Sequence, residues 1–139
     1  TSSHEAIRYF SGAAAYNNRF TITKEQLQSG NTILLELNDV IEVADVFLNG
    51  DKLGNHWHKS QVFDITRNVK EGDNVLTIEV VNSINNALIG DAKRPEQFRV
   101  YKSNITKLPN AWSTPFADAS LLKAGLIGPV VIKIVKGVK

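Results

Sequence analysis

The chain has 139 residues, of which 42% are hydrophobic and 22% are charged, so it has the balance of an ordinary globular domain and not of a disordered segment. Basic residues exceed acidic residues by 16 to 14, a net charge of +2 that is not gathered into a run. Because nucleic-acid binding needs a concentrated basic stripe, we expect no nucleic-acid partner. The absence of cysteine excludes disulfides, iron–sulfur clusters, thiolate zinc sites and a cysteine nucleophile.

The length fits one domain, and we expect a single domain over residues 1–139. No apolar run approaches the roughly 20 residues that a membrane-spanning helix needs, so we expect no membrane partner. The chain has no methionine and begins at Thr1. We therefore expect that it was processed at its N-terminus or was cut from a longer protein.

Strand signals dominate the chain from its first third to its end. Short runs rich in β-branched residues predict strands over 16–22, 32–37, 43–48, 74–81 and 129–135. Turn signals separate these runs, and the strongest is Asn49-Gly50, a pair typical of a tight β-hairpin. Further turn signals lie at 29–31 and 71–74.

Helical signals are weak by comparison. Only residues 23–27 and 117–123 could form a helix, and each would be a single short turn. There is no alternation of strands and long helices, so a parallel sheet is not expected. The many short strands with frequent turn signals indicate an all-β, antiparallel β-sandwich or barrel, and of these we expect the sandwich. The least strand-like stretch is an irregular insertion over about 83–125, and such insertions are usually either functional or flexible.

A catalytic apparatus is not evident in the sequence. A glycosidase needs two carboxyl groups in one cleft, one of them with a raised pKa, and no pair of acidic residues is singled out by its pattern. There is also no Gly-x-Ser-x-Gly turn that would present a serine nucleophile. We therefore expect that this chain is not itself an enzyme.

His56 and His58 are two positions apart, so on a strand they would share a face and could bind one metal ion. Two ligands are too few for a metal site, and no third is evident. The alternative is a pair of exposed or hydrogen-bonded histidines that flank Trp57.

Carbohydrate sites combine a flat aromatic ring with polar side chains that bind hydroxyl groups. Trp57 and Trp112 are the candidate aromatic platforms, and the alternative is that each tryptophan packs in or over the core. With their polar neighbours, the candidate carbohydrate-binding residues are Trp57, His56, His58, Asn86, Arg94 and Trp112.

Six segments, in order along the chain, resemble the sugar-binding-type domains of glycoside hydrolase family 2, including those of rhamnosidase-like bacterial enzymes. Two of them match most fully: 86–91, Asn-Ala-Leu-Ile-Gly-Asp, and 124–130, Ala-Gly-Leu-Ile-Gly-Pro-Val. The other four segments are 9–20, 43–54, 63–66 and 72–76.

This resemblance implies a galactose-binding-like jelly roll that acts as a non-catalytic accessory domain, structural or carbohydrate-binding, of a larger glycoside hydrolase. The implied partners are carbohydrate and the catalytic domain of the parent enzyme, and the implied location is secreted or periplasmic. No cofactor is expected, although domains of this kind can hold a structural Ca²⁺. Two alternatives remain open: a free-standing carbohydrate-binding module and a protein-interaction module.

Overall fold

The computed structural model describes residues 4–57, 60–102, 104–108 and 111–137. The chain divides into two compact units. Unit 1 comprises Thr1–Gly12 and Asn82–Lys123, and unit 2 comprises Ala13–Val81 and Ala124–Lys139. Each unit is taken by itself below.

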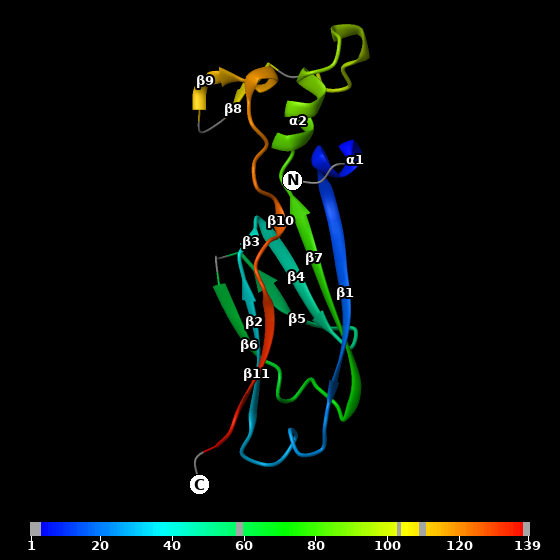
Figure 1. Ribbon diagram of the computed structural model, residues 1–139, viewed down its shortest axis with the longest axis vertical. Helices are drawn as coiled ribbons and strands as arrows, with labels where there is room; N and C mark the ends of the chain where they lie inside the picture. The colour runs from blue at the N-terminus through cyan, green and yellow to red at the C-terminus, as the bar shows by residue number, and fades with distance from the viewer. Residues whose placement is uncertain (1–3, 58–59, 103, 109–110, 138–139) are drawn as a thin grey trace. The chain divides into compact units, whose positions relative to one another are not determined.

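Unit 2 contains a four-stranded sheet with the strand order β1-β7-β4-β5 (Figure 1). Strands β4 and β5 form a hairpin, and β4 also pairs antiparallel with β7. The bounds of the four strands are β1 Gly12–Ile22, β7 Gly72–Asn82, β4 Val43–Leu48 and β5 Asp51–His56.

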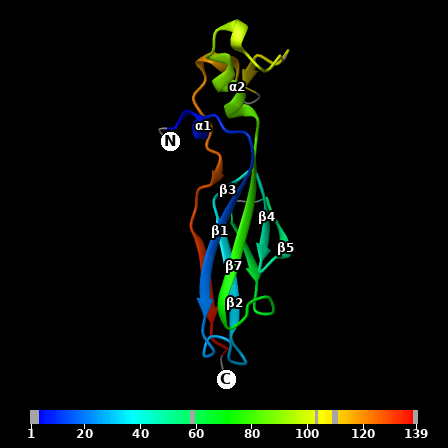
Figure 2. The same cartoon turned by 90° about the vertical axis from the view of Figure 1, so that its right-hand side faces the viewer.

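A three-stranded sheet with the order β11-β2-β6 forms the second layer of unit 2, and its central strand β2 is antiparallel to both neighbours. Figure 2 shows β2 behind the long strands β1 and β7, from a direction at right angles to that of Figure 1. The strands of this sheet are β11 Val130–Val135, β2 Thr32–Asn38 and β6 Ser60–Asp64, and a further short pair joins β10 Gly125–Leu126 to β3 Val40–Ile41.

The core of unit 2 is made by the alternating side chains of these strands. Every second residue of β2 is completely buried, and β4 and β7 follow the same period of two. Each fully buried leucine or isoleucine contributes roughly 1.5–3 kcal/mol, so this face holds the sheets together. The buried aliphatic residues of the three strands are Ile33, Leu35, Leu37, Ala44, Val46, Leu48, Leu76, Ile78 and Val80. The predicted all-β, antiparallel sandwich is confirmed.

The hairpin between β4 and β5 has the two-residue turn that Asn49-Gly50 predicted. Asn49 has φ 53° and Gly50 has φ 94°, and Leu48 pairs with Asp51 across the turn. Both turn residues therefore adopt the left-handed conformation that the twist of a tight hairpin requires.

Unit 1 has a small core of its own around helix α2. Ile89, Phe116 and Ala119 are buried in it, and Tyr9 and Leu88 pack against them. The elements of unit 1 are α1 Glu5–Arg8, α2 Asn85–Ala92, η1 Glu96–Phe98, β8 Lys107–Leu108, β9 Ala111–Pro115 and η2 Phe116–Asp118.

Helix α2 is the main element that the sequence did not predict, because it lies inside the stretch expected to be irregular. Its residue before the first turn, Ile84, makes no side-chain capping bond, and no acidic residue lies in its first turn. The usual signals of a helix start are thus missing.

The two helical turns that were expected have different outcomes. Residues 23–27 form a turn in which the side chain of Gln26 accepts a hydrogen bond from the amide of Thr23. The expected turn over 117–123 is wrong: only the short η2 forms, and Ala119 is already extended with ψ 143°. In the described parts of the chain, no helix is long and apolar enough to cross a membrane.

Candidate functional site

The residues predicted to bind carbohydrate divide between the two units. In unit 2, His56 ends β5 and is completely buried, whereas Trp57 directly after it is 73% exposed. In unit 1, Asn86 is 7% exposed on α2, and Arg94 lies on the surface just after that helix. Because the His56 imidazole is buried, its position does not support a role in binding a metal ion or a sugar. The Trp57 ring is exposed enough to serve as a stacking platform.

Two predicted site residues fall where the structure gives no side-chain description. His58 lies outside the described residues, and the side chain of Trp112 in β9 lies outside them as well. The carbohydrate-binding role of the whole set stays a prediction.

Asn86 has a clear structural role in unit 1. Its side-chain Nδ2 donates to the carbonyl oxygen of Leu122 at 2.9 Å, and the amide of Leu122 donates to its Oδ1 at 2.8 Å. The carboxamide therefore ties the first turn of α2 to a segment 36 residues further along the chain.

A cavity of about 240 Å³ opens in unit 1 beside α2. One side is made by α2 and the segment that follows η1, and the other by the end of β9 and by η2. The lining residues combine apolar walls with a few polar groups: Leu88, Asp91, Ala92, Arg99, Tyr101, Ile105, Thr106, Pro115, Phe116 and Ala117. Such a combination is typical of a small-ligand site.

Asp91 fixes the wall of this cavity. Its carboxylate accepts hydrogen bonds from the amide of Val100 at 2.9 Å and from the amide of Tyr101 at 2.9 Å. Burial alone would raise the pKa of Asp91, but these two bonds and the nearby Arg94 and Arg99 together lower it below its ordinary value. Asp91 is therefore ionised at neutral pH.

Arg99 is held in place by the end of α2. Its Nε donates to the carbonyl oxygen of Arg94 at 3.1 Å, and its Nη2 donates to that of Ala92 at 3.0 Å. Ala92 is the last residue of α2, so its carbonyl group is one of those that the C-terminus of a helix leaves without a partner. The guanidinium is thereby oriented at the edge of the cavity.

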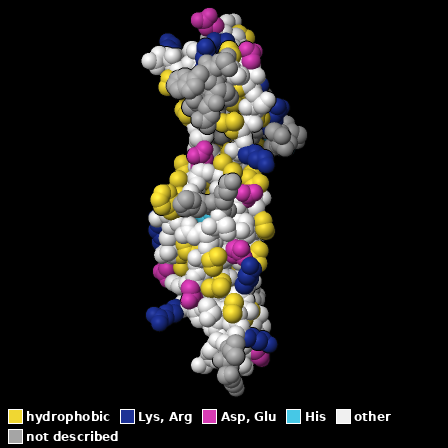
Figure 3. All heavy atoms as spheres, turned by 90° about the vertical axis from the view of Figure 1, so that its left-hand side faces the viewer, with side chains coloured by type: hydrophobic (Ala, Val, Ile, Leu, Met, Phe, Trp, Pro, Cys, Tyr) yellow, Lys and Arg dark blue, Asp and Glu magenta, His cyan; other side chains and the backbone are white. Residues whose placement is uncertain are grey.

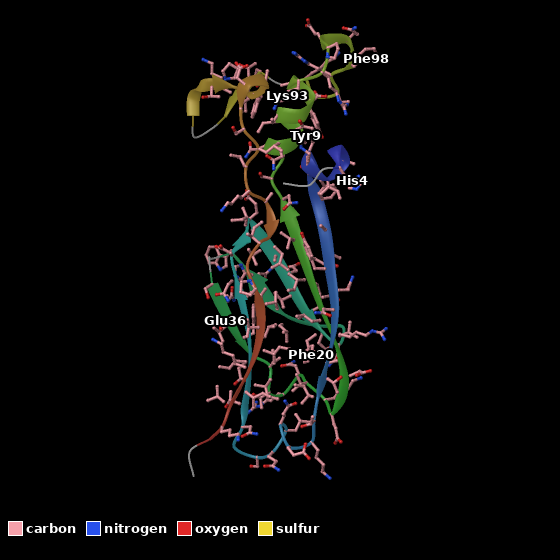
Figure 4. All side chains as sticks on the ribbon, viewed as in Figure 1. His4, Tyr9, Phe20, Glu36, Lys93 and Phe98 are labelled. Atoms are coloured by element: carbon pink, nitrogen blue, oxygen red, sulfur yellow. The ribbon has the colours of Figure 1, made fainter. Side chains whose placement is uncertain are left out.

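Most of the residues that line the cavity come from a segment with a net positive charge. Residues 91–107 hold five basic residues and two acidic residues, a net charge of +3, so the rest of the chain carries −1. The basic residues of this segment are not gathered into a run, because they are interleaved with apolar and acidic residues. Figure 3 shows dark blue basic side chains beside yellow hydrophobic and magenta acidic side chains among the upper atoms of the view, and Figure 4 labels Lys93 and Phe98 in the upper part of the ribbon.

The arrangement does not resemble a glycosidase active site. Asp91 is the one carboxylate among the lining residues, and a lowered pKa is the opposite of what a general acid needs. Glu25 and Asp64 also have lowered pKa values, caused first by hydrogen bonds from Thr23 and Thr66 respectively. Among the described residues, no group of three or more His, Cys, Asp or Glu side chains could hold a metal ion.

Comparison with known proteins gives a family match over most of the chain. Residues 3–119 match the family described as "Glycosyl hydrolase 2 galactose-binding domain-like". A curated relative is the "Putative beta-glucuronidase" of Formosa agariphila, which is 35% identical over 94% of this chain. The chain spans only 13% of the length of that relative.

Solved structures of glycoside hydrolases also match this chain over a small part of their own length. The rhamnosidase from Novosphingobium sp. PP1Y matches 96% of this chain with 35% identity and a TM-score of 0.75, over 12% of its own length. The β-glucuronidase of Bifidobacterium dentium, solved with coumarin-3-O-glucuronide, matches 54% of this chain with 30% identity and a TM-score of 0.51, again over 12% of its length. The similarity thus covers a small part of each of these enzymes.

Proposed function

Because this chain belongs to the glycosyl hydrolase 2 galactose-binding-like domain family, we propose that it is a non-catalytic accessory domain of a larger glycoside hydrolase. The observation that carries the proposal is the combination of a match over 3–119 with coverage of only 13% of a relative. A glycosidase active site on the rest of such an enzyme would fit the finding that the cavity described above lacks the carboxyl pair of a glycosidase.

The chemistry of the cavity supports a non-catalytic role. Hydrolysis of a glycosidic bond needs a protonated carboxylic acid and a second carboxylate about 5–10 Å away. Asp91 is ionised and its oxygens are occupied by the amides of Val100 and Tyr101. A group in that state can position a loop but cannot protonate a leaving group.

The first test is a hydrolysis assay of the purified chain on 4-nitrophenyl β-glucuronide, α-L-rhamnoside and β-galactoside. We expect no release of nitrophenol above a buffer control. Turnover that persists through purification and disappears in Asp91→Asn would overturn the proposal, because it would assign catalysis to this unit.

The second test is the coding frame of the gene. We expect a glycosidase catalytic domain in the same frame as these 139 residues. A frame with the galactose-binding-like domain and no glycosidase domain would contradict the accessory role and would favour a free-standing carbohydrate-binding module or a protein-interaction module.

A further inference from the structure

We infer that the cavity of unit 1 is a binding site for an acidic saccharide, with the Arg99 guanidinium receiving its carboxylate or sulfate group. The inference deepens the proposed function and rests on it, because an accessory domain of a glycoside hydrolase makes a saccharide the expected class of ligand. None of the residues that the sequence predicted to bind sugar lines this cavity, although Arg94 lies close to the lining residue Asp91.

Charge selects an anionic ligand. The segment 91–107 carries a net charge of +3, and six of the ten residues that line the cavity belong to this segment. An excess of one sign around a concave surface attracts ligands of the opposite sign. Of the five basic residues of the segment, Arg99 is among the residues that line the cavity, and the other four are Lys93, Arg94, Lys102 and Lys107.

Arg99 supplies an oriented donor group for the anion. Its guanidinium has five N–H donors, and in the described part of the chain two of them are used on the carbonyl groups of Arg94 and Ala92. The remaining donors lie on a group whose direction is already set, so binding does not need to order a long side chain. Guanidinium groups bind carboxylates and sulfates through paired, charge-assisted hydrogen bonds.

The negative charge of Asp91 does not oppose this assignment. Both of its oxygens accept from the backbone amides of Val100 and Tyr101, and Arg94 and Arg99 lie close enough to lower its pKa. Its charge is therefore offset inside the wall, and the segment retains its net charge of +3 with Asp91 included.

The size and lining of the cavity favour one sugar ring. At about 240 Å³ it is smaller than the roughly 300–1,000 Å³ of sites for drug-sized ligands. Phe116 and Pro115 give an apolar wall for the C–H face of a ring, and Tyr101 and Thr106 offer hydroxyl groups.

The test compares three sugars that differ only at C6: D-glucuronate, D-glucose 6-sulfate and D-glucose. In ¹⁵N NMR titrations of the full chain, we expect an acidic sugar to bind at least about tenfold more tightly than glucose, with shifts at Val100, Tyr101 and Thr106. The tighter of the two acidic sugars identifies the anionic group as carboxylate or sulfate. Equal affinity for all three sugars would overturn the inference.

A matched pair of variants locates the site. Arg99→Gln should weaken binding of the acidic sugar about tenfold or more, and Arg19→Gln, the same change at an exposed position of unit 2, should alter it less than about twofold. Equal effects of the two substitutions would mean that the affinity depends only on the net charge of the chain, and would contradict a binding site at Arg99.

Two further arms keep the inference testable. Tyr101→Phe leaves the charge and the backbone bond to Asp91 in place, and should weaken binding about three- to tenfold if the hydroxyl contacts the sugar, even where Arg99→Gln fails to fold. If poly-L-glutamate binds and none of the three sugars does, the inference of a saccharide ligand is overturned, and the result favours an acidic protein partner. Sugar binding is measured on this chain alone, whereas the accessory role is tested by the hydrolysis assay and by the coding frame. A failure of the binding inference can therefore be told apart from a failure of the accessory role.

Discussion

The carboxamide of Asn74 is completely buried and makes four hydrogen bonds. Its Nδ2 donates to the carbonyl oxygens of Lys70 and Gly72, and its Oδ1 accepts from the amide of Lys70 and from Nδ2 of Asn49. Asn49 in turn accepts from the amide of Val75 and donates to the carbonyl of Asn68. This pair of asparagines joins the β4–β5 hairpin to the loop that precedes β7.

Asn74→Ala should destabilise the chain by about 3 kcal/mol or more, because it leaves several partly buried backbone groups without partners at about 1–3 kcal/mol each. Urea unfolding followed by circular dichroism measures the change. Asn68→Ala, at an exposed side chain in the same loop, is the matched control and should change stability by less than about 0.5 kcal/mol. A small effect of Asn74→Ala would refute the network's role.

Asp91 gives unit 1 a pH dependence. Its pKa is lowered in the folded chain, so the stability that it contributes is present above its ordinary value of about 3.8 and is lost as the pH falls through its folded value. Asp91→Asn should therefore lower the melting temperature near pH 7, and the difference from the native chain should shrink as the pH falls below about 3.8.

Hydrogen exchange gives a local measure of the same effect. The amides of Val100 and Tyr101 donate to Asp91 and should exchange faster in Asp91→Asn at neutral pH. Exchange rates that are unchanged, or a difference in melting temperature that stays constant with pH, would show that the carboxylate does not hold this segment.

At the level of the element, helix α2 depends on one close contact. A Cβ atom on Gly90 would lie 2.5 Å from Cγ of Tyr9, whose ring packs on the small core of unit 1. In Figure 4 Tyr9 lies next to α2. The glycine is therefore needed for the packing of the ring, although glycine is a poor helix former.

Gly90→Ala sets two effects against each other. Alanine should stabilise the helix by about 1 kcal/mol, while overpacking against the ring should cost about 1–3 kcal/mol. We expect the steric term to win, since an atom at 2.5 Å from a ring carbon cannot be accommodated without moving the ring. Combining Gly90→Ala with Tyr9→Ala in a double-mutant cycle should give a loss smaller than the sum of the two, and strict additivity would exclude the contact.

For the whole molecule, the division into two units with separate cores has a measurable result. Gly90→Ala should speed hydrogen exchange within 84–101 in unit 1 and leave the protection of 33–37 in β2 unchanged. Hydrogen exchange with mass spectrometry on the full chain distinguishes the cases. Equal acceleration in both segments would mean that the chain unfolds as one cooperative unit.

The strands and the hairpin of unit 2 could be predicted because their signals are local. Alternation over 32–37 and 43–48 reports the buried face directly, and Asn49-Gly50 reports the turn. The segment 63–66 could be recognised in the sequence only by its resemblance to a family pattern, and the structure gives the physical reason for that pattern. The Thr66 hydroxyl binds Asp64 and also accepts the amide of Ile33, so it links β6 to the start of β2.

The cavity could not be predicted in the same way. Its walls come from α2 and from Pro115 and Phe116, more than 20 residues further on, and α2 itself lacks a capping signal. The net charge of 91–107 can be read from the sequence, but it is hidden when charges are counted over the whole chain. The two hydrogen bonds between Asn86 and Leu122 join residues that are 36 positions apart, so no short sequence pattern predicts them.

The Asn49-Gly50 turn also sets how this protein ages chemically. Asparagine followed by glycine is the pair most prone to deamidation, because the glycine amide can attack the side-chain carbonyl once the backbone is free to bend. Here the carboxamide is held by Val75, Asn68 and Asn74. The folded chain should therefore resist deamidation at Asn49, and a chain that unfolds often should gain about one mass unit there and lose the donors that join the hairpin to its neighbouring loop.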